Sequence, residues 1–500
     1  MAFRSEVREA IRKYYLGGAP DTASASGSDG NAAVEVGGIE FISTSSRQNN
    51  QEAMQEMQAD LRNRKTPAVV LVSETIQAAV AKGASDVHIE PQSNETAIRI
   101  RVDGVLRDFK SVPRAIQNSL ISRIKILADM DIAERRTPQD GRFMVNLGQR
   151  QIDLRVSTLP TQYGEKIVMR LLDSSAQMVS FSDVGMPQQV AAELSGLLSV
   201  PQGMVLVTGP TGSGKSTTLY SALNLLRKPS VNIVTVEDPV EYVLPGINQS
   251  HVNTKAGLTF ASCLRSILRQ DPNIIMVGEI RDVETAEIAM KAAQTGHLVL
   301  STLHTNDSVS AIVRLQDLGI ASFLISSSLT AIVAQRLVRK LCSCHGVRRA
   351  TREFRARLTQ SGVAQPPETM PVPVGCALCD HTGYKGRVGI FELLRFDESV
   401  RAVVRNGGRS DQVWSAARAQ GMRTMQDDAI EKLGACVTSL DEILRVISFE
   451  EMAQLTCVAC DQNLLPGFRF CPYCGVPCEA SRHARRTQPN RTVPEKSFSR

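Results

Sequence analysis

Apolar and polar residues alternate in two segments of the first third of the chain, which is the pattern of a half-buried β-strand. Apolar residues alternate with arginines over 98–102 and with charged residues over 152–156. Neighbouring patterns predict a helix at 69–80 and two further strands at 86–90 and 166–172. Asp103-Gly104 is the signal of a hairpin turn. Together these elements predict an α+β unit that ends near Asp173, followed by a linker over 174–187.

After Pro201 the pattern changes, because short runs that are mainly apolar alternate with stretches of helical spacing. The apolar runs predict strands at 204–208, 233–237, 274–278 and 298–303, and the helical spacing predicts helices at 216–226 and 284–293. Strands that alternate with helices in this way form a parallel sheet with crossover helices. An α/β fold is therefore expected for the second part of the chain.

The first 66 residues lack such patterns. Residues 19–38 are rich in Ala, Ser, Gly and Asp, a composition that buries little apolar surface. Helical patches are expected at 6–16 and 48–65. This region is predicted to be a low-complexity, partly helical arm.

Composition and charge then exclude several classes. Of the 500 residues, 42% are hydrophobic and 22% are charged, as in an ordinary folded chain, so a fibre or global disorder is excluded. No apolar run reaches the 18 residues of a membrane-spanning helix, and no secretory signal is seen. The net charge of +6 is concentrated in residues 482–500, which hold six basic residues and one acid. The near-neutral body argues against a nucleic-acid-binding face.

The strongest chemical signal is a phosphate-binding loop with the pattern G-x-x-x-x-G-K-[ST], between a predicted strand and a predicted helix. Its glycines let backbone N–H groups face a phosphate, its lysine supplies a cation for the β- and γ-phosphates, and its serine hydroxyl suits Mg²⁺. The loop comprises Gly209, Pro210, Thr211, Gly212, Ser213, Gly214, Lys215, Ser216 and Thr217.

Acidic residues at strand ends complete the predicted chemistry. Glu279 follows the apolar run at 274–278, so a parallel sheet delivers it to the same edge as the loop, where it would orient or activate water. Glu237 ends another strand, with Glu241 nearby. His297 and His304 bracket the strand at 298–303, and a role in sensing phosphate or in a polar network is open for both.

Five segments in this order resemble the motifs of the GspE/PilB family of type II secretion and type IV pilus assembly ATPases. They are the loop at 209–217 and the segments at 236–241, 264–272, 277–282 and 295–306. Segments 85–91, 138–141 and 154–160 resemble the second N-terminal domain of that family. The resemblance extends from about Ala68 to Ile447.

The resemblance implies a RecA-like P-loop motor domain preceded by an α+β, PAS-like domain, in a homohexamer with ATP between the two domains. It places Arg155 and Arg170 where family arginines reach the nucleotide, and it matches Arg265 and Arg269 to arginines of the motor domain. Cations that arrive as a site closes stabilise a γ-phosphoryl transition state. The implied partner is an inner-membrane platform protein of the PilC/GspF type, reached from the cytoplasm.

Eight of the eleven cysteines lie in close pairs, which indicates metal rather than disulfides in a chain without a signal peptide. Cys376 and Cys379 match a family motif that holds zinc with an upstream pair. The upstream half contains Cys342, Cys344 and His345, so the fourth ligand is either Cys344 or His345. A second set, Cys457, Cys460, Cys471 and Cys474, has the spacing of a zinc ribbon.

The sequence therefore predicts six parts: an arm at 1–66, an α+β domain at 67–174, a linker at 175–190, a RecA-like ATPase domain at 191–450 with a Cys-rich insertion at 340–390, a zinc ribbon at 455–480 and a basic tail at 481–500. The predicted function is ATP hydrolysis that powers assembly of pilus or pseudopilus subunits. Three alternatives on the same fold are a pilus retraction motor, a nucleotide-gated regulator and a nucleic-acid motor. Retraction members of the family usually lack the tetracysteine insertion and are shorter, so Cys376 and Cys379 favour assembly.

Overall fold

A computed structural model describes residues 33–36, 39–42, 67–173, 179–352, 354–355, 359, 366–447, 455–456, 463–464 and 474–476. The chain forms two compact units, one built mainly from residues before Leu172 and the other mainly from residues after it. The predicted helices at 6–16 and 48–65, the basic tail, and Cys457, Cys460 and Cys471 lie outside the described residues.

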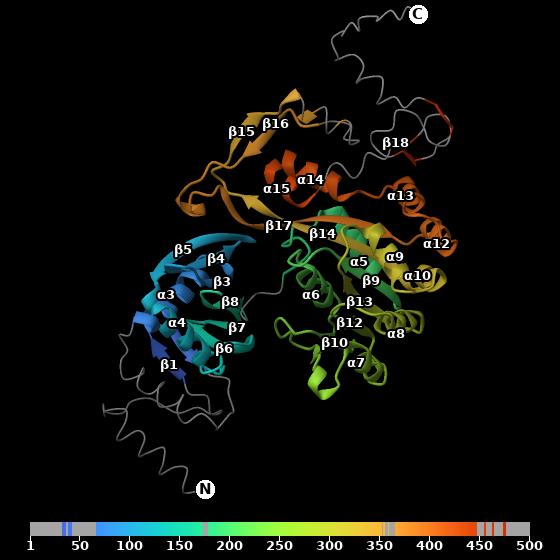
Figure 1. Ribbon diagram of the computed structural model, residues 1–500. Coiled ribbons are helices and arrows are strands. Elements are labelled where there is room, and N and C mark those ends of the chain that lie inside the picture. Colours follow the sequence, from blue (N-terminus) through green and yellow to red (C-terminus); the bar gives the residue numbers. More distant parts are fainter. Residues whose placement is uncertain are drawn as a thin grey trace, which may run out of the picture. The chain divides into compact units, whose positions relative to one another are not determined.

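An eight-stranded sheet carries the first unit, in the order β1-β2-β6-β7-β8-β3-β4-β5 (Figure 1). Its strands are β1 (Ala33–Val36), β2 (Ile39–Ile42), β3 (Ala84–Pro91), β4 (Glu95–Val102), β5 (Val105–Pro113), β6 (Gln139–Leu147), β7 (Arg150–Thr161) and β8 (Gly164–Asp173). The four strands predicted here are confirmed. Asp103 and Gly104 both have positive φ, 52° and 81°, as the predicted hairpin turn requires.

Among the described residues of this unit are the helices α3 (Pro67–Ala81) and α4 (Arg114–Leu127), which pack against each other. The helix predicted at 69–80 is confirmed as α3. Fully buried aliphatic residues from helices and strands, such as Ile76, Ile98 and Ile124, form the core. One buried ion pair lies among them: Nζ of Lys125 is 2.5 Å from Oε1 of Glu165, with side chains 1% and 4% exposed.

The hairpin β1–β2 differs from the arm expected for residues 1–66. β2 pairs antiparallel with β6, so these residues extend the sheet. Ile39 and Phe41 are buried, and the ring of Phe41 stacks on that of Phe143 at 6.3 Å. Apolar residues alternate over the short segment 39–42, and this segment pairs with β6, a strand far along the chain. The composition of a longer window does not reveal so short a strand.

The second unit contains a seven-stranded sheet in the order β11-β10-β12-β13-β9-β14-β17. The strands are β9 (Gly203–Thr208), β10 (Ile233–Glu237), β11 (Asn248–His251), β12 (Ile274–Val277), β13 (Leu298–Leu303), β14 (Leu329–Leu341) and β17 (Tyr384–Arg395). All neighbours pair in parallel except β14 and β17. The predicted parallel sheet and its four predicted strands are confirmed.

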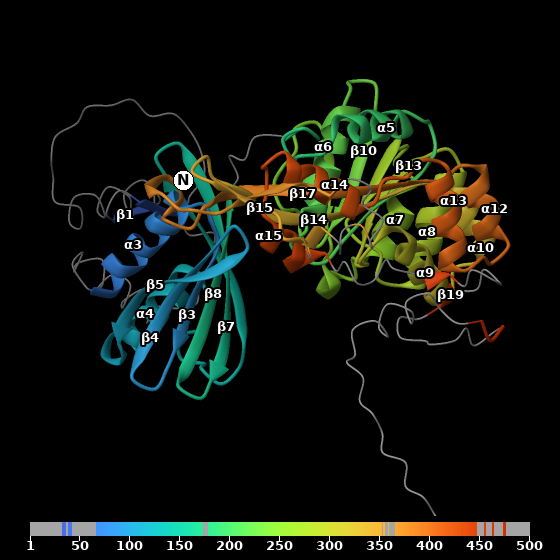
Figure 2. The same ribbon diagram turned by 90° about the horizontal axis from the view of Figure 1, so that it is seen from above.

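Helices cover both faces of this sheet (Figure 2). α5 (Gln188–Leu198) and α6 (Lys215–Leu226) contribute Leu194, Leu219 and Leu223 to one apolar layer. The opposite layer is formed by α7 (Phe260–Ile267), α8 (Val283–Gln294), α9 (Ser308–Asp317) and α10 (Ser322–Ser328). The two helices predicted in this part are confirmed as α6 and α8.

The remaining described elements are short. They are the 3-10 turns η1 (Thr254–Ala256) and η2 (Ala377–Cys379), strands β15 (Gly346–Arg349), β16 (Thr369–Val372), β18 (Leu455–Thr456) and β19 (Asn463–Leu464), and helices α12 (Glu398–Arg405), α13 (Ser410–Ala419), α14 (Met425–Gly434) and α15 (Leu440–Val446). Within the expected linker, Phe181 and Met186 are buried in the α5–α6 layer, so 179–187 belongs to the packed unit. No helix in the described parts of the chain has both the length and the apolarity to cross a membrane.

Candidate nucleotide and metal sites

The phosphate-binding loop connects β9 to α6, as the motif predicts. Gly214 caps the start of α6 with φ 89°, in the left-handed region that glycine favours. Gly209 has φ 152°, and a Cβ there would lie 2.5 Å from the backbone oxygen of Gln335 and from Oγ of Ser213. These two glycines are therefore required by the conformation and by the close packing of β14.

Lys215 lies at the first position of α6 and is 9% exposed. Its Nζ donates hydrogen bonds to the backbone oxygens of Gly209 (2.9 Å) and Pro210 (3.1 Å), so it folds back across the loop. Burial lowers the pKa of Lys215 to about 8, Glu279 acts in the opposite direction, and Arg336 lowers it further. The amino group of Lys215 is thus held against the backbone of the loop.

Glu279 follows β12 at the carboxyl edge of the sheet, where the loop also lies. Its Oε1 accepts a hydrogen bond of 2.5 Å from Nη2 of Arg281, and its Oε2 lies 3.2 Å from Nε2 of His304. Arg281 also lies 3.4 Å from Oδ2 of Asp238, the residue after β10. Burial opposes ionisation of Glu279, but Arg281 and then His304 outweigh it, so its pKa is lowered. The site keeps a partly buried carboxylate charged.

Glu237 is a different kind of carboxylate, because it is buried and all its partners are internal. It accepts hydrogen bonds from the hydroxyls of Tyr220 and Thr235 and from the Nε2 atom of Gln249. Burial and the charge of Glu237 raise the pKa of Tyr220 above its usual range. The Glu237 network joins α6 to β10 and β11 and so fixes the helix that starts at the phosphate loop.

The structure separates the two histidines. His304 follows β13 and reaches Glu279, whereas His297 precedes β13 and its Nδ1 contacts the backbone oxygen of Ala292 at 3.1 Å. Because a strand carries its two ends to opposite edges of the sheet, His297 lies at the edge away from the phosphate loop. A role in sensing phosphate therefore does not fit the position of His297.

The predicted supporting residues Arg265, Arg269 and Glu241 make contacts with other residues of the second unit. Arg265, on α7, pairs with Glu284 of α8, and Arg269 donates to the backbone oxygen of Arg265 at 2.8 Å. The backbone N–H of Glu241 donates to the hydroxyl of Tyr220 at 3.3 Å. All three take part in local contacts of the second unit.

Arg155 and Arg170 belong to the first unit. Arg155 lies on β7 opposite Arg142 of β6. Arg170 lies on β8, where its Nε is 3.0 Å from Oδ1 of Asp86 on the paired strand β3, and its side chain is 61% exposed. Both arginines therefore lie on adjacent strands of the eight-stranded sheet.

Four cysteines, Cys342, Cys344, Cys376 and Cys379, converge so that their sulfur atoms all lie within 4.8 Å of one another. Three of the sulfur pairs are separated by 3.8–3.9 Å. That separation is the edge of a tetrahedron with zinc–sulfur bonds of about 2.3 Å, so the cluster fits zinc. Cys344 occupies the fourth position that the sequence left open, and His345 instead contacts the backbone oxygen of Cys342 at 3.1 Å.

Backbone donors surround one of these sulfurs. The sulfur of Cys379 accepts hydrogen bonds from the N–H groups of Cys376 (3.2 Å) and Gly383 (3.3 Å). Burial acts to raise the pKa of Cys379, but these donors outweigh it and lower the pKa to about 6. A thiolate is the form that ligates metal. Of the second cysteine set, only Cys474 is described, and it is exposed.

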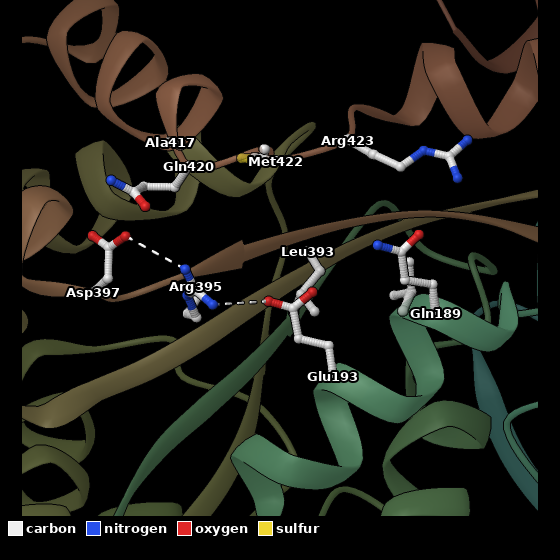
Figure 3. A pocket seen from close by; sticks show the side chains of 11 residues that line it. Gln189, Glu193, Leu393, Arg395, Asp397, Ala417, Gln420, Met422 and Arg423 are labelled. Carbon is white, nitrogen blue, oxygen red and sulfur yellow. Dashed lines mark ion pairs between the residues drawn. The ribbon is translucent and has the colours of Figure 1, made fainter.

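A separate pocket has no residue of the candidate nucleotide and zinc sites in its lining (Figure 3). It is bounded by α5, the end of β17 and the segment after α13, and Arg395 in it lies 3.7 Å from both Glu193 and Asp397. No residue of the phosphate loop lines it. The pocket is therefore not the candidate nucleotide site.

Sequence reasoning missed Arg281 and Gln335. Arg281 lies two residues after Glu279 in a motif that the sequence analysis singled out, so its proximity was a usable signal. Gln335 contacts the loop from β14, 122 residues away from Ser213 along the chain, and no local pattern marks it.

These features define an α/β protein with a P-loop and a charged carboxylate at one sheet edge. The family model described as Type II/IV secretion system protein matches residues 62–445. The chain belongs to this family, and within it to the GspE/PilB group of secretion ATPases.

Relatives and solved structures agree with that placement. The chain is 49% identical over 380 residues to Type II secretion system protein HxcR of Pseudomonas aeruginosa, covering 76% of this chain and 77% of the relative. It is 45% identical over 394 residues to the Type IV pilus assembly ATPase PilB of Thermus thermophilus, covering 79% of this chain and 44% of the relative. Among solved structures, the pilus retraction motor PilT with bound ADP matches with TM-score 0.52 and 28% identity, covering 75% of this chain and 96% of that chain.

Proposed function

We propose that this protein hydrolyses ATP to power the assembly of pilus or pseudopilus subunits, as a homohexameric motor. The observation that carries the proposal is the meeting of the phosphate loop, which follows β9, with Glu279, which follows β12, at the carboxyl edge of one parallel sheet. Ligands of open α/β sheets bind at that edge. The relatives named for secretion and pilus assembly support the choice of process.

In the proposed site, loop N–H groups and Lys215 bind the β- and γ-phosphates, and the hydroxyl of Ser216 holds Mg²⁺. Bound Mg²⁺ would neutralise phosphate charge. Glu279, kept ionised by Arg281, orients water for in-line attack, and His304 holds its second oxygen. Arg155 and Arg170 of the first unit supply guanidinium groups to the nucleotide when the site closes, so hydrolysis would be coupled to motion of that unit.

The domain assignments belong to the same proposal. Residues 67–174 serve as the PAS-like domain that moves, and 191–450 serve as the RecA-like motor. The zinc ribbon at 455–480 and the basic tail at 481–500 stay predictions of the sequence, because most of their residues lie outside those that the structure describes. A platform protein of the PilC/GspF type would receive the motion at the cytoplasmic face of the inner membrane.

Zinc has a structural role in this proposal. One zinc ion would be held by the thiolates of Cys342, Cys344, Cys376 and Cys379. It would join the segment that follows β14 to the segment that precedes β17. The predicted ribbon would hold a second zinc ion. The four-cysteine cluster also favours assembly over retraction, since the retraction members of the GspE/PilB-like ATPases usually lack the Cys-rich insertion at 340–390.

Phosphate release from Mg-ATP by the purified full chain tests the proposal, together with light scattering to detect a hexamer formed with ATP. The expected result is steady turnover that rises with hexamer formation and is indifferent to added DNA or RNA. A chain that binds ATP without turnover would instead be a nucleotide-gated regulator, and marked stimulation by DNA would indicate a nucleic-acid motor.

A further inference from the structure

Gln335 approaches the phosphate loop from the neighbouring strand. It lies on β14, next to Ala334, which pairs in parallel with Thr208 at the end of β9. Its side chain is 1% exposed, and its Nε2 atom donates a hydrogen bond of 2.6 Å to the backbone oxygen of Ser213. Among the described residues, its Oε1 atom has no hydrogen-bond partner. Within the described part of the chain, the bond to the loop is therefore the one polar contact found for this buried amide.

That contact controls the direction of the next N–H group. The oxygen of Ser213 and the N–H of Gly214 belong to the same peptide group, and in a planar trans peptide the two point in opposite directions. A donor that holds the oxygen from the β14 side turns the N–H of Gly214 away from β14. In phosphate loops, the backbone N–H groups that face the inside of the loop bind the nucleotide phosphate.

The packing around the contact allows little alternative. A Cβ on Gly214 would lie 3.0 Å from Nε2 of Gln335 and 3.5 Å from a methyl group of Leu337. A Cβ on Gly209 would lie 2.5 Å from the backbone oxygen of Gln335. One residue of β14 thus lies against two points of the loop, with its backbone at Gly209 and its side chain at Ser213.

We infer that Gln335 is a positioning residue for nucleotide binding: its amide fixes the peptide between Ser213 and Gly214 so that the N–H faces the phosphate. The inference rests on the proposed nucleotide site. It adds a residue outside the phosphate-loop motif, which acts through the backbone and does not touch the nucleotide.

The test is Gln335→Met in the full-length protein, which keeps the length of the side chain and removes the donor. The dissociation constant of fluorescently labelled ADP should rise about tenfold, since one oriented hydrogen bond is lost and the oxygen of Ser213 stays buried. KM for ATP should rise by a similar factor while kcat stays within about threefold. That split is the signature of a contact made equally to ground state and transition state.

Thr438→Val is the matched control. The Oγ1 atom of Thr438, also fully buried, donates a hydrogen bond of 2.8 Å to the backbone oxygen of Arg339 on the same strand β14. This variant should lower the melting temperature to a similar degree and leave the ADP dissociation constant unchanged. The two variants therefore separate orientation of the loop from general support of β14.

Three results would overturn the inference: a native ADP dissociation constant in Gln335→Met, an equal rise in Thr438→Val, or a native protein that binds no ADP. The last would remove the proposed function as well. If the native protein binds ADP but releases no phosphate from ATP, the proposed hydrolysis fails, whereas a tenfold weaker binding in Gln335→Met still supports the role of Gln335.

Discussion

The guanidinium group of Arg281 donates a hydrogen bond of 2.5 Å to Oε1 of Glu279. The same guanidinium lies 3.4 Å from Asp238, so it links the acids that follow two adjacent strands, β12 and β10. Burial alone would raise the pKa of Glu279, and Arg281 is the largest of the influences that lower it. The ionisation of the proposed catalytic carboxylate therefore depends on this pair.

Replacement of Arg281 by Ala should move the acidic limb of the kcat profile to higher pH. Without the cation, burial dominates, the pKa of Glu279 rises, and the carboxylate is protonated at a pH where it is normally charged. A shift of about one pH unit or more is expected from loss of a neighbouring opposite charge. Phosphate release measured from pH 5 to 8 checks this. Arg409→Ala, which breaks a surface pair with Asp411, should leave the profile in place, and an unmoved limb in Arg281→Ala would contradict the assignment.

Replacement of Glu279 by Gln should reduce kcat by roughly 10²–10⁴-fold, the usual contribution of a positioned acid or base. The dissociation constant for ADP should stay near the native value, because the phosphate loop is intact. Single-turnover phosphate release and ADP titration measure the two quantities. Glu287→Gln, an exposed residue of α8 paired with Lys291, is the control and should be as active as the native protein. Turnover that survives in Glu279→Gln would remove this residue from its role.

Binding of ADP should weaken as the pH rises through about 8. Burial lowers the pKa of Lys215 to about 8 in the free protein, and only the protonated ammonium attracts phosphate. Below that pH the contribution is complete. Above it, the dissociation constant should rise, approaching tenfold per pH unit for one linked proton. Titrations between pH 7.5 and 9.5 test this. Lys215→Arg should show a flatter dependence, since arginine keeps its charge throughout the range.

The zinc content of two variants should show whether Cys344 or His345 is the fourth zinc ligand. Metal analysis of the native chain should give two zinc ions. Cys344→Ser should lose one of them and unfold at a lower temperature, because its sulfur lies 3.9 Å from that of Cys379 within the four-sulfur cluster. His345→Ala should retain both. Loss of zinc in His345→Ala with retention in Cys344→Ser would reverse the ligand assignment.

Replacement of Glu165 by Gln should destabilise the first unit by about 3–5 kcal/mol, because it leaves the buried charge of Lys125 without its counter-ion. Hydrogen exchange of peptides from α4 and β8 is the suitable measurement, since a chain of two units need not unfold in one step. Glu74→Gln breaks the exposed pair with Lys110 and should change protection little. An equal loss of protection in the two variants would show that the buried pair stabilises the unit no more than the exposed pair does.

Local pattern was enough to predict the strands and helices that build the nucleotide site. Short, mainly apolar and β-prone runs of five or six residues predicted β9, β10, β12 and β13, and the glycines and lysine after β9 predicted the phosphate loop. The rule that parallel strands share a carboxyl edge then placed Glu279 beside the loop. The sequence did not separate His297 from His304; the structure did, with His304 beside Glu279 and His297 beside Ala292 at the other end of β13.

The sequence by itself therefore determined the phosphate loop and the individual strands and helices around it, because each depends on residues close together in the chain. The rule for parallel strands then predicted that Glu279 lies at the same edge of the sheet as the loop. Tertiary structure alone decided that Cys344 completes the sulfur cluster, that the strand at Ile39–Ile42 joins the sheet at β6, and that Gln335 holds the peptide after Ser213. These contacts join residues between 35 and 122 positions apart, and they exist only in one strand register and one packing arrangement. Local periodicity specifies which residues form a strand, whereas the neighbour of that strand is selected by the packing of the whole unit.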